Sequence, residues 1–265
     1  MKNTFRKAAL STICMLIVAV MSLTGVTYAW FTASTQAAVN GMEVNIGTAG
    51  AGLQVATVGG EWAGEITLQS PNAAFVPVST IDAQNFYSAT VDANAPTQIV
   101  KSVKDTTNFW TQDFRMRNTG NGDITVALNA EVFGAKNGNA DAWKAARIAI
   151  FQVTEVGAMT TTGGVASAAT AGLKFIHGEG GTYLGLKAEG ENFSMTDATN
   201  AALGEVSSFK NNYADCQFVV PGMTDANVNQ EATYRIVIWF EGQDSDCIND
   251  KALSSFTVDL KFEVK

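Results

Sequence analysis

The chain has 265 residues, with 17 Lys and Arg against 25 Asp and Glu, and a formal net charge of −8. Such an acidic chain gains no free energy from neutralising phosphates, which argues against nucleic acid partners and against binding to anionic membrane surfaces. Charged residues make up 16% of the chain, below the usual level of about 25%. This composition suits an exported, closely packed assembly.

Residues 1–29 have the three parts of a secretory signal peptide. The basic start contains three cationic residues: Lys2, Arg6 and Lys7. An apolar run from Ala8 to Val26 follows, and Thr27 and Ala29 then place small residues at positions −3 and −1 of a cut before Trp30. The run is close to the about 20 residues that span a bilayer, so an uncleaved anchor is the alternative. We expect cleavage, with membrane contact only through the uncleaved signal.

Two cysteines, Cys216 and Cys247, lie outside the signal. A single pair in an oxidising compartment predicts a disulfide. It would close a loop of about 30 residues and contribute ~3 kcal/mol in the chain-entropy description. Two buried free thiols are the alternative. Two cysteines and one distant histidine do not make a zinc site.

Alternation of apolar and polar residues is typical of strands along most of the chain. Phe114–Asn118 and Ile124–Val132 alternate on either side of the turn residues Asn118–Gly122, a pattern that predicts a β-hairpin. Tyr234–Phe240 is a β-branched and aromatic run, which predicts a strand buried on at least one face. Phe256–Val264 alternates and predicts a strand with one buried and one exposed face.

Shorter strands and little helix are expected in the rest of the chain. Short strands are predicted in three early segments: Met42–Ile46, Gly52–Val58 and Ile66–Leu68. A turn or two of helix is predicted at Asp141–Ala146, before a strand at Arg147–Val153. A second short helix is predicted at Asp197–Leu203, after the capping residue Thr196.

These patterns predict an all-β fold, a two-sheet antiparallel sandwich of jelly-roll type with one or two short helices in the connections. The expected organisation is a signal peptide at 1–29, an N-terminal segment at 30–40 and a single jelly-roll-like domain at 41–265. No internal repeat or proline-rich linker marks a second domain.

Catalytic residues are hard to find in this sequence. His177 is the only histidine, so the His-Glu-x-x-His spacing of zinc proteases is absent. One acidic stretch carries side-chain oxygens that suit calcium: Glu241, Asp244, Asp246, Asn249 and Asp250. Their spacing differs from the helix-flanked calcium loop, and an acidic turn with Asx hydrogen bonds is the alternative. No cofactor other than calcium is expected.

Three segments together resemble the TasA/camelysin family of exported Gram-positive biofilm matrix fibre proteins. Thr27–Thr32 resembles the junction cut by that family's dedicated signal peptidase, of the SipW type, and Phe114–Gly120 resembles its central hairpin. Ile238–Gly242 is similar to a late strand of such secreted proteins. The resemblance implies a secreted jelly-roll subunit of the extracellular matrix or cell surface. It also implies self-association into fibres, with other matrix or accessory fibre proteins as further partners.

In such fibres, the resemblance implies, the freed N-terminal segment of one subunit completes the sheet of the next. The segment Trp30–Val39 has no charge and no proline. A sheet edge with unpaired N–H and C=O groups accepts a strand from another chain. After Trp30, one face of the extended segment would present five side chains: Phe31, Ala33, Thr35, Ala37 and Val39. The alternatives are the first strand of the chain's own sandwich or a disordered terminus.

Two other functions compete with a fibre subunit. The first is a camelysin-like secreted metalloendopeptidase, although the sequence offers no recognised catalytic set. The second is an accessory cell-surface binding module. We expect the purified mature protein to leave casein uncleaved with and without a chelator, as measured by release of soluble peptides. Chelator-sensitive cleavage would favour the peptidase.

Overall fold

The computed structural model describes residues 37–39, 42–49, 52–69, 73–92, 95–135, 145–153, 170–177, 183–206, 217–223, 231–242 and 256–265. These ranges contain strands β1 to β17 and no helix. The all-β prediction is therefore confirmed, and the strands form several sheets that are mostly antiparallel.

One five-stranded sheet has the order β15-β9-β17-β2-β4. Its strands are β2 (Met42–Ala49), β4 (Glu65–Gln69), β9 (Ile124–Ala135), β15 (Gln217–Val220) and β17 (Phe256–Val264). Neighbours are antiparallel except for β2 and β17, which run parallel. The prediction of antiparallel sheets is wrong for this pair. The two strands come from opposite ends of the chain, so no tight hairpin turn forces them to run antiparallel.

The second five-stranded sheet has the order β11-β10-β16-β8-β3 and is antiparallel throughout. Its strands are β3 (Leu53–Thr57), β8 (Trp110–Asn118), β10 (Ala146–Val153), β11 (Thr170–His177) and β16 (Glu231–Phe240). The strand predictions for Gly52–Val58, Arg147–Val153 and Tyr234–Phe240 are confirmed here. Of the helix predicted at Asp141–Ala146, residues 141–144 lie outside the described ranges and Ala146 begins β10.

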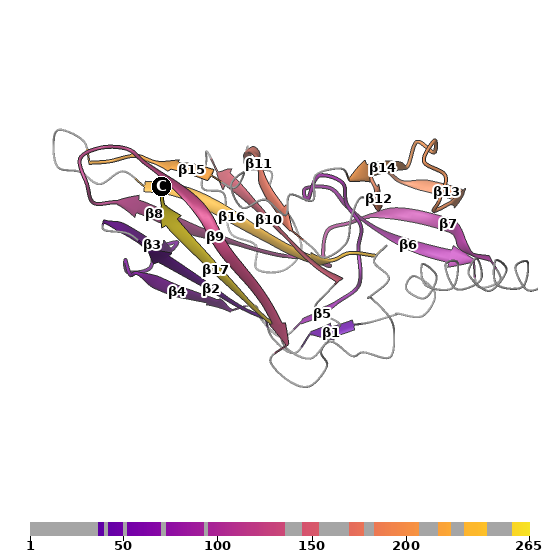
Figure 1. The fold of residues 1–265 in the computed structure, drawn as a ribbon. Coiled ribbons are helices and arrows are strands. Elements are labelled where there is room, and N and C mark those ends of the chain that lie inside the picture. The colour runs from indigo at the N-terminus through magenta and orange to yellow at the C-terminus, as the bar shows by residue number, and fades with distance from the viewer. Residues whose placement is uncertain are drawn as a thin grey trace, which may run out of the picture.

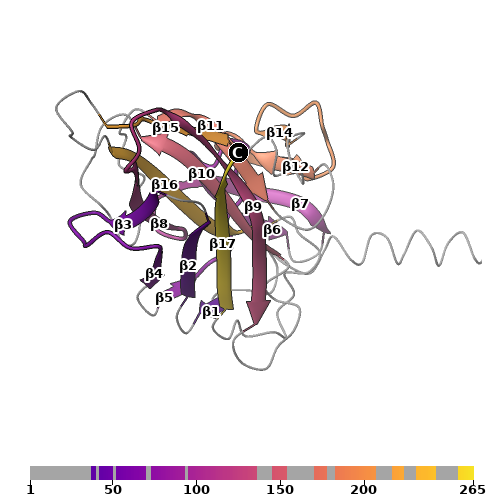
Figure 2. The same cartoon turned by 60° about the vertical axis from the view of Figure 1, so that its left-hand side comes forward.

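The two five-stranded sheets face each other across one hydrophobic core (Figures 1 and 2). Aromatic rings from opposite sheets meet there: the centroids of Phe114 and Phe262 are 6.1 Å apart, and those of Phe218 and Tyr234 are 4.4 Å apart. In β17, Val258, Leu260 and Phe262 are buried while Asp259 and Lys261 are exposed. The alternation predicted for this strand is confirmed, and it sets which face enters the core.

The predicted hairpin at Phe114–Val132 is wrong in its pairing, although both strands exist. β8 and β9 belong to different sheets, so the turn between them is an arch across the core. Asn118 is buried and shapes this arch: its Nδ2 donates to Gly122 O (2.6 Å) and its Oδ1 accepts from Gly120 N (2.8 Å). Met223 N also donates to Gly120 O (2.8 Å). The turn's hydrogen bonds thus hold the arch and not a two-strand ladder.

A lobe of five further strands lies beside the two large sheets (Figure 1). A three-stranded sheet has the order β13-β7-β6, and β12 pairs with β14. These strands are β6 (Phe86–Asp92), β7 (Ala95–Asp105), β12 (Tyr183–Leu186), β13 (Gly190–Ser194) and β14 (Leu203–Val206). The lobe has its own apolar cluster, which includes Ile99, Leu186 and Phe193. It is built from two chain segments that are far apart in sequence.

The lobe is joined to the second large sheet by aromatic packing. Phe86 stacks on Phe109 with ring centroids 4.2 Å apart and meets Trp239 edge-on at 5.5 Å. Trp239 and Val237 belong to the face of β16 that points away from the main core, and both are buried in this second cluster. β16 is therefore buried on both faces, whereas the sequence pattern predicted burial of at least one face.

The helix predicted at Asp197–Leu203 is wrong; the segment is a series of tight turns. Asn200 N donates to Asp197 O (2.9 Å), and Leu203 N donates to Asn200 O (3.1 Å). The side chains of Asp197 and Asn200 accept hydrogen bonds as well. Thr199 N donates to Asp197 Oδ1, and Ala202 N donates to Asn200 Oδ1. Such Asx bonds compete with the helical ladder.

The central aromatic residue of this fold is Phe262, which is fully buried between Phe114 and Phe218. We expect Phe262→Ala to lower the free energy of unfolding by about 3–5 kcal/mol, because it removes buried surface and leaves a cavity. Denaturant unfolding would measure the loss. Val219→Ala, at a position 53% exposed, is the control and should change stability by less than about 0.5 kcal/mol. Equal losses in the two variants would contradict this account of the core.

Candidate functional site: sheet edges and the N-terminal segment

The predicted donor segment is only partly described by the structure. Ala37–Val39 form β1, which pairs antiparallel with β5 (Ala73–Phe75) in a two-stranded ribbon. This ribbon is separate from both five-stranded sheets. The other predicted donor residues lie outside the described ranges: Trp30, Phe31, Ala33 and Thr35. The cleavage residues Thr27 and Ala29 also lie outside them.

The ribbon lies close to one end of the first large sheet. Only two residues separate the end of β1 at Val39 from the start of β2 at Met42. Met42 is paired in register with Phe256, and Phe256 with Ala135. The first residue of β2 is therefore level with the last residue of β9. Both views show β1 near that end of β9 (Figures 1 and 2). β1 therefore lies near this end of the first sheet.

One side of the two-sheet unit is closed by the connection between β3 and β4. Val55 and Ala63 exchange two backbone hydrogen bonds of 2.8 and 2.9 Å, and Thr48 N donates to Gly64 O (2.9 Å). Trp62 packs over the guanidinium groups of Arg115 and Arg117, 4.8 and 4.5 Å from its ring centroid. These contacts tie an edge of one sheet to an edge of the other, which leaves little unpaired backbone on this side.

Fewer pairings of the opposite side fall within the described ranges. β15 pairs with β9 over Ile124–Ala127, and its first residue, Gln217, is the first residue described after Val206. Within the described ranges, no strand pairs with this edge of β9 from Leu128 onward. β11 is the terminal strand of the other sheet and pairs only with β10 there. Unpaired N–H and C=O groups along such edges are templates for another strand.

The predicted calcium ligands are mostly outside the described residues: Asp244, Asp246, Asn249 and Asp250. Cys216 and Cys247 lie outside them too, so the calcium site and the disulfide stay predictions. Glu241 is described and fully buried, and its Oε2 accepts a hydrogen bond from Trp239 Nε1 (3.1 Å). Its backbone N donates to Ala145 O (2.9 Å). Glu241 is thus built into the junction between the second sheet and the lobe.

Chemistry-bearing clusters are scarce in the part of the chain that the structure describes. His177 is the last residue of β11, in register with Ile148 of β10. Among the described residues, no group of three or more His, Cys, Asp or Glu side chains is placed to hold a metal ion. The same residues include no helix long and apolar enough to cross a membrane.

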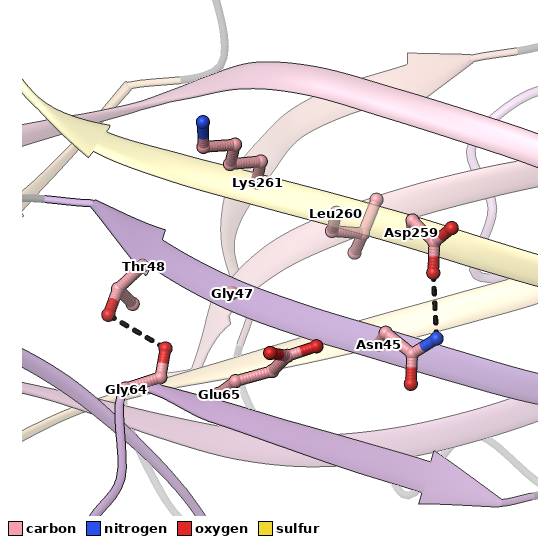
Figure 3. A pocket seen from close by; sticks show the side chains of 8 residues that line it. All are labelled: Asn45, Gly47, Thr48, Gly64, Glu65, Asp259, Leu260 and Lys261. Atoms are coloured by element: carbon pink, nitrogen blue, oxygen red, sulfur yellow. Dashed lines mark hydrogen bonds between the residues drawn. The ribbon is translucent and has the colours of Figure 1, made fainter.

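A polar depression of about 430 Å³ lies on the outer face of the first sheet, across β17, β2 and β4 (Figure 3). Its floor is Gly47, where a Cβ atom would meet nothing within 4 Å. Asn45 Nδ2 donates to Asp259 Oδ1 (2.7 Å) on one side of it, while Lys261 and Glu65 lie on opposite sides of Gly47. The depression suits a hydrophilic group more than an apolar one.

Sequence reasoning missed a buried ion pair on the second sheet. Arg235 and Asp113 are cross-strand partners on β16 and β8. Arg235 Nε contacts Asp113 Oδ1 at 2.6 Å, and Arg235 Nη2 contacts Asp113 Oδ2 at 2.9 Å, with 3% and 1% of the side chains exposed. The pair is bidentate, the strongest geometry for these groups. The sequence signal was weak: Arg235 interrupts the apolar run Tyr234–Phe240, but Asp113 is one of three charged residues in β8.

In the lobe, the pKa of Tyr87 is raised, first by burial and then by the negative charges of Asp82 and Glu189. The phenol of Tyr87 therefore stays neutral over the physiological range. On the exposed turn after β13, hydrogen bonds from Thr199 lower the pKa of Asp197.

Comparisons with protein-family models, with curated proteins and with solved structures gave no match to this chain.

The buried ion pair gives a sharp stability test. We expect Asp113→Ala to cost about 3–5 kcal/mol of unfolding free energy, because it leaves the Arg235 guanidinium buried without its carboxylate. The double variant Asp113→Leu with Arg235→Met should recover most of that loss, since neither position then holds a buried charge that has lost its partner. Denaturant unfolding of the three proteins would measure both effects.

The matched control is the exposed pair of Arg115 and Glu231 on the same two strands, 2.7 Å apart with 40% of the Glu231 side chain exposed. Glu231→Ala should cost less than about 1 kcal/mol, because solvent screens an exposed pair. Similar losses at Asp113 and Glu231 would show that burial does not govern the energetics of the pair.

Proposed function

We propose that this chain is an exported structural subunit that assembles head to tail into extracellular fibres. Each subunit would donate its N-terminal segment, freed by signal cleavage, to the sheet of the next. The two packed sheets would follow a jelly-roll topology. The observation that carries the proposal is the place of β1. Ala37–Val39 pair with β5 in a ribbon that is separate from both five-stranded sheets in the described residues, so the end of the N-terminal segment is not a strand of either sheet.

The resemblance to the TasA/camelysin family supports the same function independently of the geometry. It rests on the export junction at Thr27–Thr32, on the segment Phe114–Gly120 and on Ile238–Gly242. The second of these segments forms the end of β8 and the start of the arch, so the resemblance concerns its sequence and not its pairing. A secreted location at the surface or in the matrix of a Gram-positive bacterium belongs to the same proposal.

The chemistry of the segment before Ala37 also favours assembly. Residues 30–36 carry no charge and no proline, so each can enter a β-ladder without a desolvated charge or a missing N–H. Trp30 and Phe31 would supply apolar surface, at about 25 cal/mol for each Å² removed from water. Because the contact joins different surfaces of two copies, it does not have to close and can extend into a filament.

We expect deletion of residues 30–36 from the mature protein to abolish fibres, because the donated backbone and its two aromatic anchors are lost. Negative-stain electron microscopy at neutral pH should show filaments for the intact mature protein and none for the deletion. Light scattering should report a monomer. The unprocessed precursor should also fail to polymerise.

The matched control replaces residues 30–36 with seven Gly and Ser residues, which keeps the length of the segment but removes the anchors and weakens strand propensity. It should behave like the deletion. Wild-type fibres from either variant would refute donation of this segment, and monomers from the intact mature protein would refute the fibre function itself.

A further inference from the structure

We propose that the polar depression on the outer face of the first sheet binds an uncharged saccharide. This inference goes beyond the fibre function and does not depend on assembly. The depression measures about 430 Å³, within the range of about 300–1,000 Å³ that is common for small-molecule sites. It is formed by three strands that pair directly with one another, β17, β2 and β4.

Gly47, on the floor of the depression, is the feature that points to a ligand. Glycine weakens the interior of a strand, because it loses more backbone entropy than other residues and packs no side chain. The fold does not require glycine here, since its φ lies outside the left-handed region and a Cβ would meet nothing within 4 Å. Gly64, which also lines the depression, has the same open space. A strand glycine of this kind often marks the close approach of a ligand.

One row of polar side chains crosses the three strands beside this floor. Thr67 Oγ1 donates to Asn45 Oδ1 (2.8 Å), and Asn45 Nδ2 donates to Asp259 Oδ1 (2.7 Å). Both hydrogen bonds fix the orientation of the Asn45 amide before a ligand arrives, and such preorganisation reduces the entropy cost of binding. Asp259 is exposed, so its second carboxylate oxygen can accept a hydrogen bond from a ligand.

The next row places opposite charges on either side of the floor. Gly47 pairs with Lys261 of β17 and with Glu65 of β4, and Figure 3 shows these two residues on opposite sides of it. Two strand spacings separate the backbones of Lys261 and Glu65, which is roughly 10 Å. A ring that lies on Gly47 would therefore have an ammonium donor on one side and a carboxylate acceptor on the other.

The lining favours an uncharged ligand that is rich in hydroxyl groups. Two carboxylates, of Glu65 and Asp259, outnumber the ammonium of Lys261 in the lining, which disfavours an anion. Among the described residues, no group of three or more His, Cys, Asp or Glu side chains is placed to hold a metal cation. A hydroxyl group both donates and accepts, so it can pair with the carboxylates, the amide and the ammonium alike. Sugars carry several such groups on one ring.

A peptide strand fits this surface less well. A peptide that extends a sheet needs an edge with unpaired backbone groups. β2 is paired on both sides at the floor of the depression, with β17 and with β4. The depression therefore offers side-chain groups for recognition, and a sugar needs no backbone ladder to use them.

Saturation-transfer difference NMR of the intact mature protein tests the proposal. The method observes the small ligand, so it works for a monomer and for a fibre alike. Maltose, cellobiose and N,N′-diacetylchitobiose are the probes, and a tetrapeptide of serine and asparagine is a polar reference without sugar rings. We expect saturation transfer to at least one of the disaccharides and none to the tetrapeptide.

Variants of the depression then locate the site. Gly47→Val fills the floor and should abolish the transfer, while it keeps or raises the melting temperature, because valine favours strands and a Cβ at this position has open space. Glu65→Ala should weaken binding about tenfold, because a hydrogen bond to a charged group is lost. Thr90→Val, at an exposed position of β6 in the lobe, is the matched control and should keep the transfer.

Each outcome supports or overturns one part of the proposal. Absence of transfer to all three disaccharides would overturn the saccharide, and transfer to the tetrapeptide that Gly47→Val removes would overturn the class of ligand. Transfer to a sugar that persists in folded Gly47→Val would overturn the site. If Gly47→Val did not fold, unchanged affinity of Glu65→Ala would overturn the site instead. Fibres are assayed separately by electron microscopy, so the saccharide site and the fibre function can fail independently.

Discussion

The backbone of every strand has two hydrogen-bonding edges, and the pairing of those edges constrains this whole fold. β17 lies in the middle of its sheet because β9 and β2 pair with its two edges along nearly its whole length. The pairing also explains why the last strand of the chain can run parallel to the first long one. On the other edge of β9, β15 and the hydrogen bond from Met223 N to Gly120 O hold the arch end of the sheet in place. Within the described ranges, unpaired backbone is confined to a few edges, and the proposed assembly would have to use such an edge.

The second sheet carries a different constraint, because the face of β16 away from the core is also buried. Aromatic residues of the lobe cover part of this face, with Phe86 between Phe109 and Trp239. Charged groups that fall on a covered face must find partners there, since an isolated buried charge is very unfavourable. The bidentate pair of Arg235 and Asp113 meets this requirement. β16 is therefore paired on both edges, by β8 and β10, and is buried on both faces around Val237 and Trp239.

The sequence predicts the strands of this fold better than their pairing. Alternation in Phe256–Val264 correctly gives the buried face, because a period of two residues follows from strand geometry alone. The same signal at Phe114–Val132 could not tell a hairpin from an arch, since both place the same residues in the core. The difference lies in the side chain of Asn118 and in contacts with Met223, over 100 residues away. Likewise, the pattern at Asp197–Leu203 predicted a helix, but the side chains of Asp197 and Asn200 accept backbone hydrogen bonds that favour tight turns.

The tether at β1 bears on why donation would give a filament and not a closed dimer. Ala37–Val39 pair with β5 of their own chain, so the residues proposed for donation directly precede a paired strand in the sequence. Reciprocal exchange between two copies would require both short segments to reach both acceptor edges around a two-fold axis. A one-way contact would have no such requirement, and each newly docked copy would still present its own unused segment. Short donors that directly precede a paired strand would therefore favour heterologous contacts, and such contacts propagate unless their rotation closes a ring.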